Sequence, residues 1–235
     1  MKSQIKRFLP RTLHHLYNRL VSRRRIEETV GSWFDVDWKY KADKADPATW
    51  VEMYDRSWEN FTKQDLAIAD IIRIRNLIPA GSSVLDCGCG DGYLLENLAT
   101  RCHSRYGVDI SRLALYRGRK RLGAAVRLVQ SFAEHLPFKD DAFDVVVSTH
   151  TLEHVKDFEA AVAEIRRVAR KLMLILIPCQ KYLPYTADYH LPFFPNEKKL
   201  LDRVGINYAV CERYRTGDES TSYKGDVLLL IAELR

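Results

Sequence analysis

The segment 84–95, VLDCGCGDGYLL, combines two aspartates and two cysteines with three glycines at alternating positions. Cysteine thiolates commonly bind zinc, but Cys87 and Cys89 supply two ligands of the usual four, and no second pair follows at ligand spacing. We therefore expect no metal. Cys87 is interpreted as a core side chain at a strand end, and Cys89 as a small side chain in a crowded turn. The glycines are then the functional feature, because glycine lets the backbone approach a ligand closely.

The glycine spacing narrows the class of ligand. Gly88, Gly90 and Gly92 give G-x-G-x-G, whereas a dinucleotide site shows G-x-G-x-x-G and a phosphate loop ends in Gly-Lys-Ser/Thr. Tyr93 occupies the place of the last dinucleotide glycine. The spacing therefore argues against a phosphate-binding loop of either kind.

Strand-like and helix-like patterns alternate from residue 82 onwards and must position this loop. Strands are expected at 83–87, 105–109, 126–130, 143–149 and 171–177, and helices at 92–100, 111–122 and 157–170. This alternation predicts an α/β fold whose parallel sheet is covered by helices on both faces. Two last strands, 207–215 and 226–234, predict an antiparallel hairpin that closes the sheet. The glycine loop then lies beyond the carboxyl end of the first strand, where open parallel sheets bind ligands.

A family resemblance rests on several motifs in order. Asp-x-Gly-x-Gly-x-Gly, residues 86–92, resembles the first motif of class I S-adenosylmethionine-dependent methyltransferases. SFAEHLPFKDDAFDVVVSTHTLEHV, residues 131–155, is similar to the pattern of the type 11 branch. The resemblance covers residues 72–235. It implies a Rossmann-like, doubly wound seven-stranded sheet of order 3-2-1-4-5-7-6 with an N-terminal helical extension, and S-adenosyl-L-methionine as cofactor.

The resemblance also implies which residues hold the cofactor. Carboxylates suit a ligand with an ammonium group, a sulfonium and a ribose diol. Asp109 ends the second strand and can accept hydrogen bonds from both ribose hydroxyls. Ile110 would press on the adenine face. The implied cofactor-binding residues are Asp86, Gly88, Cys89, Gly90, Asp109, Ile110, Phe132, Ala133 and His150.

One position departs from the family pattern. The family often has an aspartate before Ala133-Glu134 that reaches the adenine amino group, and here the residue is Phe132. Ser131 or the backbone would have to replace that hydrogen bond. Phe132 itself either stacks on adenine or is an ordinary core side chain.

Three histidines are candidates for acid–base chemistry. Methyl transfer to an alcohol benefits from a base that takes the hydroxyl proton. His190, in the segment DYHLPFFPNEKKLLDRVG, is our first candidate and His150 the second, although a packed or surface histidine is an alternative for each. His154 is interpreted as structural. Glu153 lies near the substrate or caps the following turn.

The chain divides into three regions by composition. Residues 1–30 form a basic arm, in which residues 1–25 hold eight Lys or Arg and no acid. These residues carry a net charge of +8, and the whole chain carries +6, so the remainder of the chain carries a net charge of −2. Residues 31–78 form an aromatic-rich helical cap with all four tryptophans, and residues 79–235 the methyltransferase domain. The cap aromatics either line a substrate pocket or form core or an interface.

The spacing of apolar residues in the arm predicts an amphipathic helix after Pro10. Leu13, Leu16, Tyr17, Leu20 and Val21 share one face. This helix packs on the protein's own core, rests on anionic lipid, or belongs to a transit peptide. No apolar run reaches the ~18 residues that span a bilayer. An odd cysteine count scattered over the chain favours a reducing compartment. We therefore expect a cytoplasmic protein, with residues 1–25 as a candidate peripheral membrane contact.

The function that these features favour is methyl transfer from S-adenosylmethionine to a small-molecule hydroxyl, on a sugar or glycan, lipid-linked material, or a secondary metabolite. One alternative is a cofactor-binding scaffold without turnover. Another is a nucleic-acid methyltransferase that grips phosphates with the arm. Enzymes that methylate nucleic-acid amino groups usually carry Asn/Asp-Pro-Pro-Tyr/Phe after the fourth strand, and this chain has STHTLEH there, so nucleic acid is not the expected partner.

Overall fold

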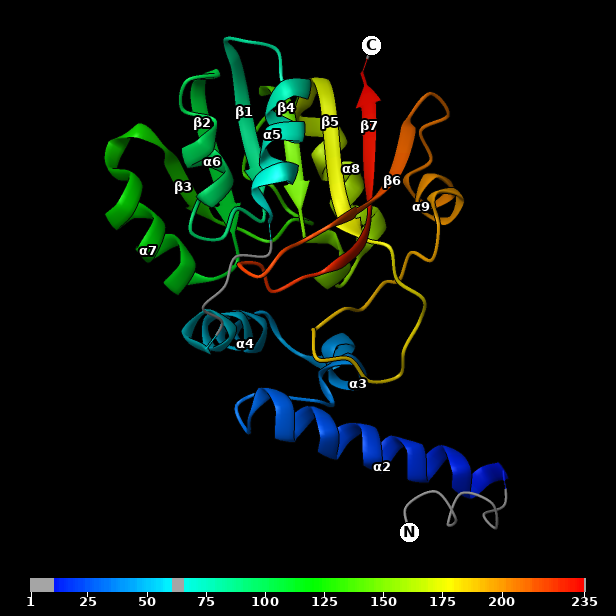
Figure 1. Ribbon diagram of the computed structural model, residues 1–235. Coiled ribbons are helices and arrows are strands. Elements are labelled where there is room, and N and C mark those ends of the chain that lie inside the picture. The colour runs from blue at the N-terminus through cyan, green and yellow to red at the C-terminus, as the bar shows by residue number, and fades with distance from the viewer. Residues whose placement is uncertain (1–10, 61–65, 235) are drawn as a thin grey trace.

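The computed structural model describes residues 11–60 and 66–234, and Figure 1 shows its central sheet. Seven strands are hydrogen-bonded in the order β3-β2-β1-β4-β5-β7-β6. They are β1 Ser82–Cys87, β2 Cys102–Asp109, β3 Arg127–Gln130, β4 Phe143–Thr149, β5 Ala169–Pro178, β6 Val210–Thr216 and β7 Gly225–Glu233. β1 to β5 run parallel, and β7 is antiparallel to both β5 and β6. The predicted fold class and strand order are confirmed.

Helices cover both faces of the sheet because its central strands are apolar on both sides. Along β5, Leu174 and Leu176 pack with α5 and α6, whereas Met173 and Ile175 pack with α8 and α9. This alternation follows from the two-residue period of a strand. The covering helices are α5 Ile68–Leu77, α6 Tyr93–Asn97, α7 Arg112–Leu122, α8 Phe158–Val168 and α9 Glu197–Val204.

A helical cap lies at the carboxyl ends of the parallel strands, as Figure 1 shows for α3 and α4. It comprises α3 Trp38–Lys41 and α4 Pro47–Asn60. We call its buried core the cap cluster: Phe34, Val36, Trp38, Ala42, Trp50, Met53, Tyr185 and Tyr189. α5, which the sequence grouped with the cap, packs on the sheet. The cap core therefore combines residues 34–53 with the connection that follows β5.

Hydrogen bonds join the cap to the connection between β5 and α9. The Asp35 amide donates to the Tyr189 hydroxyl at 3.1 Å. The Tyr40 hydroxyl donates to the Pro184 carbonyl at 3.0 Å. Lys39 Nζ donates to a backbone carbonyl of the same connection, and burial lowers the pKa of this amine to about 8. The cap therefore holds this connection through three hydrogen bonds.

The N-terminal arm continues as a helix, α2 Arg11–Val30. Ile26 and Val30, near its end, pack against the cap cluster, while Leu20 and Val21 are 61% and 46% exposed. The last turns of α2 therefore pack on the protein's own core. The predicted stripe residues Leu13, Leu16 and Tyr17 lie outside the described side chains. In the described ranges, no helix has both the length and the apolar character needed to cross a membrane.

Candidate functional site

The glycine loop joins β1 to α6 in a left-handed backbone conformation. Gly88 has φ +83° and Gly90 φ +53°. A Cβ on Gly88 would lie 2.1 Å from Thr151 Oγ1, and one on Gly90 2.4 Å from the Trp58 ring. Both positions therefore require glycine for conformation and for space. The loop is enclosed by side chains that come from α4 and from the end of β4.

The two cysteines of the loop fill space. Cys87 is buried in the core between the sheet and α8. Cys89 is buried in a small cluster with α7, and its Sγ lies 2.6 Å from where a Cβ on Gly107 would stand. Burial raises the pKa of both thiols, which keeps them neutral. Both sulfurs are free thiols among the described residues, and their burial as small side chains matches the interpretation from the sequence.

Two acidic side chains lie side by side at the ends of β1 and β2. Asp109 Oδ2 accepts from the Gly90 amide and Oδ1 from the Ser111 amide, each at 2.8 Å. Burial raises the pKa of Asp109 to about 6. Asp86 is 1% exposed, and its Oδ1 accepts no hydrogen bond from the described residues. Burial, helped by the charge of Asp109, raises the pKa of Asp86 to about 8. This pair would be stabilised by a cationic ligand.

Apolar residues after β2 and β3 form a second wall. Ile110 and Phe132 are partly buried and pack against the cap cluster, and Ala133 is buried. All three line the same cavity as the acidic pair. The Ser131 hydroxyl donates to the His135 carbonyl at 2.6 Å. Because that donor is used locally, Ser131 does not offer its proton to the cavity in this structure.

The segment after β4 brings a histidine and a second acid to the cavity. His150 has φ +49°, which is uncommon for a residue with a Cβ and often marks a functional position. Its amide donates to the Leu176 carbonyl at 2.9 Å, so β4 still pairs with β5 at this point. Glu153 is 2% exposed, and its Oε1 lies 3.5 Å from His150 Nδ1. The strained turn therefore directs His150 and Glu153 to one place.

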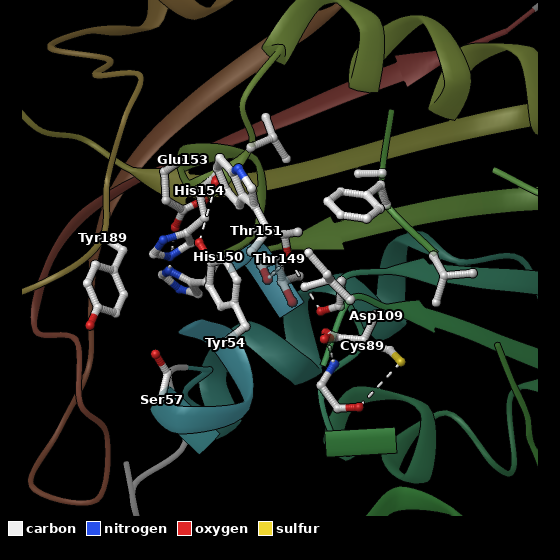
Figure 2. Close-up of a pocket in the computed structure, with 18 of the residues that line it drawn as sticks. Tyr54, Ser57, Cys89, Asp109, Thr149, His150, Thr151, Glu153, His154 and Tyr189 are labelled. Carbon is white, nitrogen blue, oxygen red and sulfur yellow. Dashed lines mark hydrogen bonds and ion pairs between the residues drawn. The ribbon is translucent and has the colours of Figure 1, made fainter. Parts of the chain in front are cut away.

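His190 joins them from the connection that follows β5. Its ring lies 4.8 Å from that of His154, centroid to centroid. His190 Nδ1 is 2.7 Å from Gln180 Oε1, so this nitrogen donates and Nε2 carries the lone pair. Burial, together with the neighbouring His154, His150 and Lys39, lowers the pKa of His190 well below its usual value. We call His150, Glu153, His154 and His190 the imidazole cluster; Figure 2 shows its first three members.

Helix α4 covers the cavity with one face. Pro47 lies in its first turn, and Asp46 caps that turn by accepting from the Thr49 amide at 2.7 Å. Side chains three to four residues apart then point the same way. The cavity-facing residues of α4 are Trp50, Tyr54, Ser57 and Trp58. The sequence offered pocket and core as alternatives for the cap tryptophans. Trp50 and Trp58 line the cavity, Trp38 belongs to the cap cluster, and Trp50 belongs to both.

A single cavity of about 960 Å³ unites these walls. Figure 2 shows Asp109 and Cys89 on one side and His150, Glu153 and His154 on the other. Every candidate residue expected from the sequence lines it: Asp86, Gly88, Cys89, Gly90, Asp109, Ile110, Phe132, Ala133, His150 and His190. Their roles stay predictions. The volume suits a cofactor together with a small acceptor.

Some lining residues were not singled out as site residues from the sequence. Thr151 donates to the Thr149 carbonyl at 2.9 Å and the Gly88 carbonyl at 3.3 Å, which ties the segment after β4 to the glycine loop. Tyr54 and Tyr189 also line the cavity. The helical spacing of aromatic residues after Pro47 was the available signal for Tyr54. Tyr189 arrives from a connection without regular structure, and the aromatic residues of that segment were the available signal for a pocket wall.

Comparisons with known proteins agree with this geometry. A family model described as a methyltransferase domain matches residues 85–176. A probable S-adenosylmethionine-dependent methyltransferase of Mycobacterium tuberculosis is 30% identical over 158 residues, which are 62% of this chain and 57% of that protein. Malonyl-[acyl-carrier protein] O-methyltransferase of Geobacter sulfurreducens is 42% identical over 89 residues, 36% of this chain and 33% of the relative.

A solved structure supports the fold. The YcgJ protein from Bacillus subtilis superposes with a TM-score of 0.58 at 16% identity, over 70% of this chain and 97% of that one. The chain spans 57% and 33% of the two curated relatives above, so the resemblance is confined to a part of each. The residues that the family model matches include the glycine loop, both acidic strand ends and the segment after β4.

Proposed function

Since the chain belongs to the class I S-adenosylmethionine-dependent methyltransferases of the type 11 branch, we propose that it transfers a methyl group from S-adenosylmethionine to a hydroxyl group of a small acceptor. The observation that carries this proposal is the pair of carboxylates, buried Asp86 and partly buried Asp109, which face one cavity beside a glycine loop.

The residues present fit this cofactor. Asp86 Oδ1 is a buried acceptor that no described group satisfies, as expected where a ligand ammonium would donate. Each Asp109 oxygen already accepts one backbone amide and has a further lone pair for a ribose hydroxyl. Gly90 has no side chain, so the backbone of the loop can approach the cofactor closely. Ile110 and Phe132 offer an apolar surface for adenine. These side chains would hold the cofactor without a phosphate-binding group.

The imidazole cluster supplies the acid–base chemistry. The cofactor, when bound, provides a methyl group on a sulfonium, which passes to the acceptor oxygen while the carbon–sulfur electron pair stays on sulfur. His190 is neutral and its Nε2 carries a lone pair, so it can accept the proton that the hydroxyl releases. His150 is the second candidate for this base. Gln180 holds the His190 ring in that tautomer.

The acceptor side of the cavity favours a ring-bearing or sugar-like molecule. Aromatic faces on α4 and Tyr189 can stack on a flat or saccharide ring. We propose a saccharide, a lipid-linked saccharide or a secondary metabolite as acceptor. Contact of residues 1–25 with a membrane belongs to the same proposal, because exposed Leu20 and Val21 adjoin Arg23–Arg25. A cytoplasmic location also stays a proposal.

Calorimetry with S-adenosylmethionine tests the cofactor site. Asp109→Ala should weaken binding by about 100-fold or more, because hydrogen bonds to a charged group contribute ~1.5–3 kcal/mol each. Asp140→Ala, at an exposed side chain, is the matched control and should bind as the wild type does. Thermal unfolding checks that both variants fold. Equal affinity of Asp109→Ala and wild type would remove Asp109 from the site.

A screen with methyl-labelled cofactor tests the reaction. We expect label in sugars, phenols or other hydroxyl compounds. Label that enters amines alone would refute transfer to oxygen. If the protein binds the cofactor but transfers label to no class of acceptor, the result would favour the cofactor-binding scaffold. If label enters RNA or DNA, the result would favour the nucleic-acid methyltransferase.

A further inference from the structure

The acceptor side of the cavity contains a group of potential metal ligands. Glu153, His154 and His190 each offer one ligand atom, and these atoms lie within 4.8 Å of one another. Glu153 and His154 come from the short 3-10 turn Leu152–His154 after β4, and His190 comes from the connection after β5. Figure 2 shows Glu153 and His154 close together at the side of the cavity away from Asp109.

The burial of Glu153 is unexplained by the protein alone. The residue is 2% exposed, and neither carboxylate oxygen accepts a hydrogen bond within the described chain. His150 Nδ1 lies 3.5 Å from Glu153 Oε1. A buried polar atom without a partner costs about 1–3 kcal/mol, and an unpaired buried charge costs more. His154 Nδ1 is a second buried atom without a hydrogen bond in the described residues.

His190 is oriented as metal-binding histidines usually are. Its Nδ1 donates to Gln180 Oε1 at 2.7 Å, which directs the lone pair of Nε2 away from Gln180. A metal-bound histidine commonly donates its other ring N–H to a carbonyl or carboxylate, and this partner sets the tautomer. Burial keeps His190 neutral, the form that binds metals.

We propose that Glu153, His154 and His190 bind a divalent transition-metal ion of the Zn²⁺ type at the acceptor end of the cavity. Two imidazoles with one carboxylate form a common catalytic ligand set, in which the remaining position stays open for water or substrate. Donor atoms bound at ~2.0–2.2 Å lie at most about 4.3 Å apart. Small rotations of the Glu153 and His154 side chains would bring the three ligand atoms to these distances around an ion. The expectation of no metal rested on the cysteine spacing and did not weigh these residues.

The ion defines the class of acceptor, and this consequence rests on the proposed function. Its open position would bind the acceptor oxygen and lower the pKa of that hydroxyl. Acceptors with two adjacent oxygens, such as vicinal diols, catechols and α-hydroxy acids, fit best, because zinc can expand from four to five ligands and both oxygens can then bind. His190 Nε2 is then a ligand, and His150, next to Glu153, becomes the residue that accepts the proton.

Metal titration tests the site without any methyl transfer. Chelator-treated protein is titrated with Zn²⁺ by calorimetry and with Co²⁺ by absorption spectroscopy. We expect one equivalent of metal, and at least 100-fold weaker binding in Glu153→Gln and His190→Gln. Gln180→Ala should weaken metal affinity by about 10- to 100-fold, which is the usual effect of removing the hydrogen-bond partner of a metal-binding histidine. His103→Gln is the control, because His103 is exposed at the opposite end of β2 and should leave binding unchanged.

Thermal unfolding is the second readout. A ligand at a hundredfold excess over its Kd raises Tm of a domain of this size by roughly 5–10 °C, and we expect this shift for wild type and not for Glu153→Gln. Binding of S-adenosylmethionine by each variant checks its folding. Weak binding at several sites, or equal Zn²⁺ affinity in wild type and in Glu153→Gln or His190→Gln, would overturn the proposal.

The failures of the two proposals are distinguishable. Stoichiometric metal binding without methylation of any hydroxyl keeps the metal site and refutes the O-methylation. Methylation at an unchanged rate in the presence of chelator keeps the proposed function, refutes the role of the ion in the reaction, and supports His190 as base. Loss of turnover on chelation with recovery on adding Zn²⁺ supports both.

Discussion

Asp86 and Asp109 make the pH dependence of cofactor binding predictable. Burial raises their pKa values to about 8 and about 6, so at neutral pH Asp86 is protonated and Asp109 mostly ionised. A cationic ligand favours the ionised form. Affinity for S-adenosylmethionine should therefore rise with pH between 6 and 8, by at most about tenfold per pH unit for each proton released.

Calorimetry at pH 6, 7 and 8 on wild type and Asp86→Asn measures this effect. The amino group of the ligand titrates equally with both proteins, so the difference between them isolates Asp86. We expect a steeper rise in the wild type. Parallel curves would mean that Asp86 does not ionise when the ligand binds.

At the residue scale, sequence reasoning could find side chains next to a recognisable motif. Asp86, Gly88 and Asp109 lie at strand ends that the pattern already predicts. The grouping of Glu153 with His190 could not be found, because the two residues are far apart in the sequence and meet through the cap and an irregular connection. The partners of a buried carboxylate are a tertiary property, which residue types alone do not reveal.

Asp144 joins three strands at the start of β4. Its Oδ2 accepts from the Ser83 amide and hydroxyl in β1, both at 2.9 Å. Its Oδ1 pairs with Arg170 and Lys171 in β5 at 2.7 and 2.8 Å. Hydrogen bonding to Lys171, followed by the bonds from Ser83 and Arg170, lowers the pKa of Asp144 well below its usual value. A depressed pKa gives stability that is present above about pH 4 and is lost as pH falls towards the folded-state value.

Asp144→Asn should therefore lower the free energy of unfolding by about 2 kcal/mol at pH 7, and by less at pH 3. The value is modest because Arg170 and Lys171 are half-exposed and water screens their charges. Urea unfolding at the two pH values measures it. Asp140→Asn, on an exposed pair with Arg167, is the control and should change stability by less than about 0.5 kcal/mol. An equal loss for Asp144→Asn at both pH values would exclude the charge as its source.

At the element scale, strands were more predictable than their connections. β4 was expected at 143–149 and is found there, because a short apolar run bounded by turns has few other ways to bury itself. α5 has an equally clear helical pattern, yet the sequence grouped it with the cap, whereas it packs on the sheet. Periodicity determines that a helix forms and which of its faces is apolar. It does not determine which neighbour covers that face.

The whole molecule is a sheet domain and a cap that share one cavity. The glycine loop and the acidic strand ends belong to the sheet domain, whereas the side of α4 that carries Tyr54 belongs to the cap. The connection that carries Tyr189 and His190 packs between the two units. Under the proposed function, the cap encloses the acceptor end, and cofactor and acceptor would meet between the two units. Exclusion of water from such a place strengthens electrostatic interactions with the bound molecules.

The charge of the molecule is concentrated in the arm, and its described part is partly neutralised. Arg23 pairs with Glu27 and Asp37, and Arg24 pairs with Glu28. Four further basic residues, Lys2, Lys6, Arg7 and Arg11, stand earlier in the arm. Each basic residue near an anionic membrane contributes about 1 kcal/mol.

The full chain should therefore bind vesicles that contain phosphatidylserine, and this binding should weaken as salt rises. Replacing these four cations with glutamine should reduce vesicle affinity by on the order of 100- to 1000-fold at low salt. Affinity for S-adenosylmethionine should stay the same, because the substituted residues precede the cap cluster and every cavity-lining residue. Vesicle sedimentation at two salt concentrations measures the effect, with neutral vesicles as control. Equal sedimentation of wild type and variant would exclude the arm as the contact, and salt-dependent binding to RNA rather than to vesicles would assign the arm to nucleic acid.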